Sequence, residues 1–201
     1  MQTPIFTWLH VSDIHFGHGD ATHSWDQKLV LSKLLEDLQH RSELDIPVPN
    51  AIFITGDIAF SGAVRALDEY DRARDWLNSI ADALHLTSRD VFLVPGNHDV
   101  QRDIYTKHRD VRRLVDRLRS GEESIDEALE DQGDYDRLSC RLQHYLGFAA
   151  QFGPETREQQ RLFWVQRIPL QYSLTLRVAG LNTALLCQDD QDQGRLALGT
   201  V

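Results

Sequence analysis

Cysteine, basic charge and long apolar runs are all scarce in this 201-residue chain. The two cysteines, Cys140 and Cys187, lie far apart and fit no metal-binding or redox spacing, so we expect two reduced thiols without a functional role. Lysine and arginine number 21 against 31 Asp and Glu, and the resulting charge of −10 excludes a general binder of polyanions. No apolar run reaches the roughly 18 residues that a membrane span needs. The first residues also lack the pattern of a signal peptide, so we expect a cytoplasmic protein without a membrane association.

The rest of the composition is that of a globular protein. Hydrophobic residues make up 41% of the chain, which is ordinary for a folded domain. Length alone favours one domain over two. We therefore expect residues 1–201 to belong to a single domain.

Three short apolar runs, rich in β-formers, each end abruptly in residues that can bind metal. Residues 5–12 lead into Asp13-Ile14-His15, residues 51–55 into Gly56-Asp57, and residues 91–95 into Gly96-Asn97-His98-Asp99. Glycine at 56 and 96 permits backbone angles or close approaches that a Cβ would block. Each turn can therefore aim a side chain inward.

Helical patterns separate these runs. Ser24 and Gln27 have the spacing of a capping box. Two apolar stripes at helical spacing follow, one of Trp25, Leu29, Leu34, Leu35 and Leu38, the other of Tyr70, Ala73, Leu77, Ile80, Ala81 and Leu84. The alternation of strand and helix predicts right-handed crossovers and a buried parallel sheet. Ligands of such sheets gather beyond the carboxyl ends of the strands, where all three polar clusters lie.

A charged helical segment follows the third run. Residues 101–119 are rich in Lys and Arg with a helical apolar pattern, residues 121–136 are acidic, and a third pattern runs from Tyr135 to Leu146. We interpret residues 101–152 as a helical insertion. Its charges can pair with one another on solvated faces, or its arginines can form a cap that meets substrate phosphate. The Arg112-Arg113 region could also attract nucleic acid locally, against the overall negative charge.

The pattern returns to strands near Leu162. Residues 162–168, then Leu174, Leu176 and Val178, then residues 181–186 predict three strands, with residues 169–173 as a hairpin connection. These strands would form a second sheet or extend the first.

The donors at the strand ends are all oxygen and nitrogen, a set that suits Mn²⁺, Fe or Zn²⁺. We expect Asp13, His15, Asp57 and Asn97 to lie within a few ångströms of one another. One carboxylate, most simply Asp57, could then bridge two metals and activate a water. The reaction that such a centre serves best is phosphoester hydrolysis.

The set of motifs resembles the calcineurin-like metallophosphoesterases, and the resemblance covers residues 5–100 well. It implies an α/β fold of two facing mixed sheets flanked by helices, an α/β/β/α sandwich, here incomplete at its carboxyl end. It also implies two divalent metal ions (Mn²⁺, Fe²⁺/Fe³⁺ or Zn²⁺), with Asp13 and His15 on the first metal, Asp57 as the bridge and Asn97 on the second. The catalytic residues implied are His98, which would face the leaving-group oxygen, and Asp99, which would orient it.

One departure from the family pattern concerns the later histidines. Relatives add a strand-borne histidine and a Gly-His-x-His motif, but only His108 and His144 follow position 99 here, both in helical stretches. The simplest expectation is that the chain is the amino-terminal part of a longer protein, with room for further domains after residue 201; the alternative is a degenerate natural relative that binds metal weakly. His18 and His23 follow the first ligand turn and either line the pocket or lie at the surface.

Two functions stay open. The first is a metal-dependent phosphoester hydrolase whose substrate is a small phosphodiester or nucleotide, with nucleic acid less favoured because the chain is acidic. The second is a metal-binding sensor or interaction module of a larger signalling protein, with little or no turnover.

Overall fold

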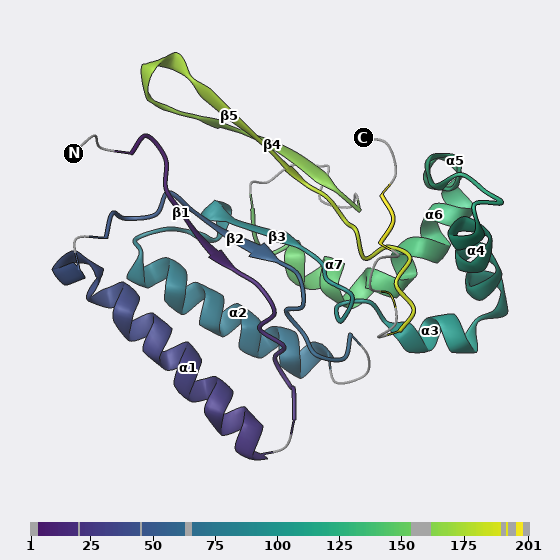
Figure 1. Cartoon of the computed structure of the whole chain (residues 1–201), viewed down its shortest axis with the longest axis horizontal. Helices are drawn as coiled ribbons and strands as arrows, with labels where there is room; N and C mark the ends of the chain where they lie inside the picture. The colour runs from purple at the N-terminus through teal and green to yellow at the C-terminus, as the bar shows by residue number, and fades with distance from the viewer. Residues whose placement is uncertain are drawn as a thin grey trace.

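A parallel sheet of three strands forms the centre of the computed structural model. The structure describes residues 4–19, 21–44, 46–62, 66–153, 162–189, 192 and 196–198. The strands β1 (Trp8–Val11), β2 (Ala51–Thr55) and β3 (Val91–Val94) run in the order β1-β2-β3, all parallel. Trp8 pairs with Ala51, and Ile52 with Val91. The predicted strand–helix alternation and parallel sheet are confirmed (Figure 1).

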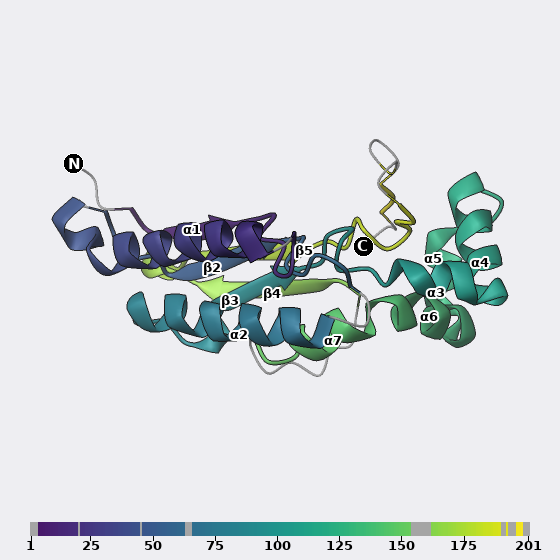
Figure 2. The ribbon, with the colours of Figure 1, turned by 90° about the horizontal axis from the view of Figure 1, so that it is seen from below.

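Two long helices, α1 (Ala21–Gln39) and α2 (Ala66–Ala83), lie side by side on one face of this sheet (Figures 1 and 2). The predicted stripe of α2 is buried against the sheet, with Leu77 and Ile80 fully inaccessible. The Trp76 indole N–H donates to the Leu31 carbonyl (3.4 Å) and joins the helices. Short 3-10 turns, η1 (Arg41–Leu44) and η2 (Ser88–Asp90), precede β2 and β3.

For α1, the predicted capping box is wrong, and the predicted apolar stripe is confirmed only at Leu35 and Leu38, which pack on the core. The helix begins at Ala21, so Ser24 lies inside it and is not its N-cap. Gln27 instead donates to the carbonyls of Ile14 (2.6 Å) and His15 (3.0 Å), because the loop after β1 passes within its reach. Trp25 and Leu29 are 63% and 43% exposed, and the face of α1 that packs on the core holds Leu31, Leu35 and Leu38.

The charged segment folds into a series of short helices that extends past the carboxyl ends of the strands (Figures 1 and 2). They are α3 (Arg102–Lys107), α4 (Arg109–Ser120), α5 (Ile125–Glu130), α6 (Gln132–Ser139), η3 (Cys140–Leu142) and α7 (Gln143–Ala149), the last packed on α2. Several of its charges pair locally: Lys107 with Asp103 (2.8 Å), and Arg117 with Glu123 (2.9 Å). These ion pairs lie within the charged segment itself.

A hairpin of β4 (Trp164–Pro169) and β5 (Thr175–Gly180) faces the side of the sheet opposite α1 and α2 (Figure 1). Its connection contains η4 (Gln171–Ser173), as the sequence predicted for residues 169–173. The Trp164 indole N–H donates to the Leu93 carbonyl (2.7 Å), and its ring covers Gly180, where a Cβ would overlap it. This contact fixes the hairpin against β3.

The strand expected at residues 181–186 is not formed. Residues 183–186 make a turn whose apolar side chains, Ala184, Leu185 and Leu186, are buried. No strand forms because arginine side chains take the carbonyls that a strand would pair: Arg141 donates to Leu185 O (2.9 Å) and Arg119 to Leu186 O (2.8 Å). Among the described residues, no helix is long and apolar enough to cross a membrane.

Candidate metal centre

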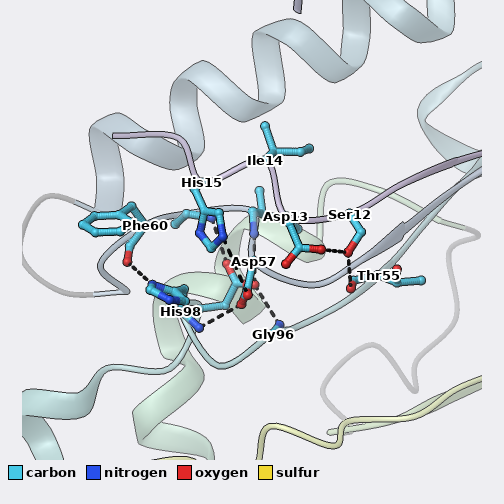
Figure 3. A network of polar contacts seen from close by, with 12 residues as sticks. Ser12, Asp13, Ile14, His15, Thr55, Asp57, Phe60, Gly96 and His98 are labelled. Carbon is cyan, nitrogen blue, oxygen red and sulfur yellow. Dashed lines mark hydrogen bonds and ion pairs between the residues drawn. The ribbon is translucent and has the colours of Figure 1, made fainter. Parts of the chain in front are cut away.

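The three polar clusters meet at the carboxyl edge of the parallel sheet (Figure 3). The loop after β1 carries Asp13 and His15, the loop after β2 carries Asp57, and the loop after β3 carries residues 96–99. Backbone hydrogen bonds join the first two loops, from Asp13 N to Gly56 O (3.2 Å) and from His15 N to Asp57 O (2.8 Å). The edge predicted from strand order is therefore where the candidate ligands lie.

Left-handed backbone conformation at three non-glycine residues turns these side chains inward. Asp13, His15 and Asp57 have φ of 58°, 54° and 54°. Such angles are uncommon outside glycine, though Asp and His adopt them more readily than most residues. Each costs on the order of 1–3 kcal/mol and persists only where the surroundings enforce it, typically at functional sites. The strain falls on candidate ligands from two different loops.

Close packing of two glycines brings the second and third loops together. Gly56 has φ of 96°, and a Cβ there would lie 2.9 Å from Gly96 Cα. A Cβ on Gly96 would overlap the carboxylate and the backbone nitrogen of Asp57. The predicted need for glycine at both positions is confirmed, because no side chain fits between these backbones.

His15, Asp57 and His98 form a cluster whose candidate ligand atoms all lie within 4.8 Å of one another. His15 Nε2 is 3.9 Å from Asp57 Oδ2, and the rings of His15 and His98 meet edge to face with centroids 4.6 Å apart. The backbone N–H of His98 also donates to Asp57 Oδ1 (2.9 Å). Three groups that are distant in sequence thus converge on one point.

The electrostatics of the cluster favour a neutral imidazole on His15. Burial lowers the pKa of His15, and the neighbouring His98 lowers it further, while Asp57 and Asp13 act in the opposite direction. A metal ion needs the neutral form of the ligand. His15 Nδ1 is buried and has no hydrogen-bond partner among the described residues. The nitrogen and oxygen donors of this cluster fit a divalent transition metal.

Asp13 and Asn97 lie beside the cluster, on a cavity of about 260 Å³ that Asp57 also lines. The Ser12 hydroxyl donates to the Asp13 carboxylate, and Thr183 and Ala184 form another part of the wall. The structure thus brings Asp13, Asp57 and Asn97 to one cavity, and His15 and His98 to the adjacent cluster.

Comparison with known proteins agrees with this geometry. The family model described as "Calcineurin-like phosphoesterase" matches residues 6–168, more than half of the chain. The chain belongs to the calcineurin-like phosphoesterase family. A 100-residue stretch is 35% identical to a Bacillus subtilis (strain 168) protein described as "Uncharacterized metallophosphoesterase-like protein YydB". That match covers 48% of this chain and 18% of the B. subtilis protein, so the chain spans well under two thirds of this relative.

In this calcineurin-like phosphoesterase, Asp99 has different partners from those that the resemblance implied. Its carboxylate is fully buried and accepts hydrogen bonds from Gly96 N (2.9 Å), Ala59 N (3.0 Å), Ile58 N (3.3 Å) and the Tyr70 hydroxyl (2.9 Å). Burial raises its pKa to about 6, and the hydrogen bonds it accepts oppose that rise. Asp99 therefore joins the second and third loops.

The His98 imidazole is held by a backbone group. Its Nδ1 lies 2.7 Å from the carbonyl oxygen of Phe60, and the Phe60 ring stacks on it with centroids 5.3 Å apart. A carbonyl only accepts, so Nδ1 carries the hydrogen and Nε2 has the free lone pair in the neutral ring. Sequence reasoning missed Phe60 because a backbone carbonyl leaves no residue-type signal.

The remaining histidines and arginines divide between pocket and scaffold. His18 lies against Phe60, with ring centroids 4.5 Å apart, at the edge of the cluster of His15, Asp57 and His98. The side chain of His23 lies outside the described residues. Arg112 and Arg113 are exposed. Arg141 is fully buried and, with Arg119, holds residues 185–187. The helical segment thus supports the residues next to the cavity wall.

Proposed function

We propose that this chain carries the metal centre of a metal-dependent phosphoester hydrolase that prefers phosphodiesters. The observation that carries the proposal is the convergence of His15, Asp57 and His98 within 4.8 Å at the carboxyl edge of the sheet. Membership of the phosphoesterase family supports the reaction class. The −10 charge supports a small phosphodiester or nucleotide over long nucleic acid.

Asp13, His15, Asp57 and Asn97 are proposed as ligands of two divalent ions, with Asp57 between them. Bound ions of this kind lower the pKa of water and stabilise the charge that develops on phosphate oxygens. Mn²⁺, iron and Zn²⁺ suit the nitrogen and oxygen donors. The left-handed residues and the packed glycines hold these side chains in place before substrate binds, so no reorganisation is needed.

His98 is proposed to act as the doubly protonated imidazolium, which gives its Nε2 proton to the leaving-group oxygen and is left as the neutral ring with its hydrogen on Nδ1. Because the hydrogen on Nδ1 is donated to the Phe60 carbonyl, Nε2 is the ring nitrogen that is available to the substrate. Asp99 is proposed to support this step indirectly, by fixing the turn that carries His98.

The test compares metal-dependent cleavage of a bis-aryl phosphate with that of the mono-aryl ester. Asp57→Ala should abolish Mn²⁺-dependent turnover, whereas His98→Ala should keep Mn²⁺ binding and lose rate by about 10²–10⁴-fold. Asp82→Ala removes an exposed carboxylate from α2 and serves as the charge control. Full activity of Asp57→Ala would contradict the role of Asp57 in the metal centre. Faster cleavage of the monoester would contradict the preference for phosphodiesters.

The second candidate is a metal-binding module without turnover. It is favoured by the ligand count, because Asp13, His15 and Asp57 give the first metal three protein ligands and Asp57 and Asn97 give the second two. Tight Mn²⁺ binding by the wild-type chain, with no cleavage of either ester, would select this alternative.

A further inference from the structure

Two adjacent residues of α2, Glu69 and Tyr70, are buried and polar although neither belongs to a ligand motif. Their exposed fractions are 3% and 4%. The Tyr70 ring stacks on Phe148 of α7, with centroids 4.8 Å apart at 25°, which fixes its position. Its hydroxyl donates to Asp99 Oδ1 (2.9 Å), and burial keeps its pKa well above the usual value, so it stays a donor.

Tyr70 thereby contacts the residue that joins two ligand loops. Asp99 accepts from Ile58 and Ala59, which directly follow Asp57, and from Gly96, which precedes Asn97. Among the residues that the structure describes, four groups donate to this carboxylate, and of these only the Tyr70 hydroxyl is a side chain. Without it, one lone-pair direction of a fully buried carboxylate loses its partner, and the carboxylate can shift relative to both loops.

Glu69 makes the matching contacts with the other loops. Its carboxylate accepts from the backbone N–H and the hydroxyl of Ser61, each at 3.2 Å. It also packs so closely on Gly17 that a Cβ there would overlap it. Gly17 follows His15 by two residues, so this contact supports the first ligand loop.

We propose that Tyr70, assisted by Glu69, is a positioning residue that sets the spacing of the three metal-ligand loops. Consecutive residues of one helix touch the loops after β1, β2 and β3, so a single rigid element holds all three in register. The inference rests on the proposed function in that the loops are taken to hold the metal. Groups that orient ligands commonly change metal affinity by about 10–100-fold when they are removed.

The experiment compares Tyr70→Phe with Tyr145→Phe. Tyr145 is a buried tyrosine of α7 near Asp99, and its hydroxyl makes no hydrogen bond to the part of the chain that the structure describes. Mn²⁺ affinity is measured by titration calorimetry, with kcat and KM for the bis-aryl phosphate and thermal unfolding alongside. Tyr70→Phe should weaken Mn²⁺ binding about 10-fold and lower kcat with little change in KM, whereas Tyr145→Phe should match wild type.

Glu69→Gln is the second variant, because it keeps the volume and removes one acceptor. It should also weaken Mn²⁺ binding, and it tests the inference should Tyr70→Phe fail to fold. Variants that lose thermal stability but bind Mn²⁺ as wild type does would show a merely structural role and overturn the inference. If the wild-type chain binds Mn²⁺ without hydrolysis, the proposed function fails while the affinity comparison still decides this inference.

Discussion

Replacing Gly96 with alanine should displace the Asp57 loop, because the two loops touch at this glycine. The new Cβ would overlap both the carboxylate and the backbone nitrogen of Asp57, so rotating a side chain cannot relieve the contact. Gly96 does not have a left-handed φ, so alanine adds no backbone strain of its own and the effect is purely steric. The substitution therefore measures how strictly the structure fixes Asp57.

The expected magnitudes follow from this overlap. Inserting a methyl group into a packed site costs about 1–3 kcal/mol, which lowers Tm by about 2–12 °C for a chain of this size. A shift of the Asp57 loop approaching 1 Å should reduce metal-dependent cleavage by about 10²-fold. Thermal unfolding and the initial rate of bis-aryl phosphate cleavage with saturating Mn²⁺ measure the two effects separately.

Gly147→Ala is the matched control. It makes the same change in α7, where nothing lies within 4 Å of the new Cβ. Because alanine favours helix over glycine by about 1 kcal/mol, this variant should be slightly more stable than wild type, with unchanged cleavage. Cleavage by Gly96→Ala within twofold of wild type would refute the reasoning, since Asp57 would then tolerate displacement.

Three further predictions concern the groups around the site. Asp99→Asn replaces one acceptor oxygen with a donor that faces N–H groups. It should lower the free energy of unfolding by about 1–3 kcal/mol per unpaired group and slow cleavage. A free energy of unfolding equal to that of wild type would argue against the buried hydrogen-bond network. Arg141→Met leaves the Leu185 and Cys187 carbonyls without their donor, and should lower Tm by several degrees, whereas Arg113→Met, at an exposed position, should not. Mn²⁺ at 100 times its Kd should stabilise the wild-type chain by about 2.7 kcal/mol, and chelation with EDTA should reverse the shift; an equal shift in Asp57→Ala would place the metal elsewhere.

Much of the site could be predicted because its elements are local in sequence. Each group of candidate ligands directly follows an apolar, β-rich run, and parallel strands joined by helices place their carboxyl ends at one edge. The sequence alone therefore assigns Asp13, His15, Asp57 and Asn97 to one edge of the sheet. The stripe of α2 was equally readable because its apolar residues are buried on one side of the helix, where Tyr70 stacks on Phe148 of α7 and Leu77 and Ile80 join the core.

Predictions failed where a local pattern competed with a distant partner. The apolar residues at 181–186 have the composition of a strand, but Arg141, about forty residues earlier, takes the Leu185 carbonyl that a strand would pair. The spacing of Ser24 and Gln27 suggested a helix cap, but the Gln27 side chain donates instead to the carbonyls of Ile14 and His15 in the loop after β1.

By itself, the sequence determined the order of the elements, the edge at which the polar clusters meet and the kind of ion that their donors suit. Only the tertiary structure decided the left-handed backbone angles of Asp13, His15 and Asp57. It also decided two hydrogen bonds, from the Tyr70 hydroxyl to the buried Asp99 and from His98 Nδ1 to the Phe60 carbonyl. The physical reason is that strand and helix patterns depend on periodicity along the chain. Backbone carbonyls and left-handed angles depend instead on contacts through space, which residue types do not specify.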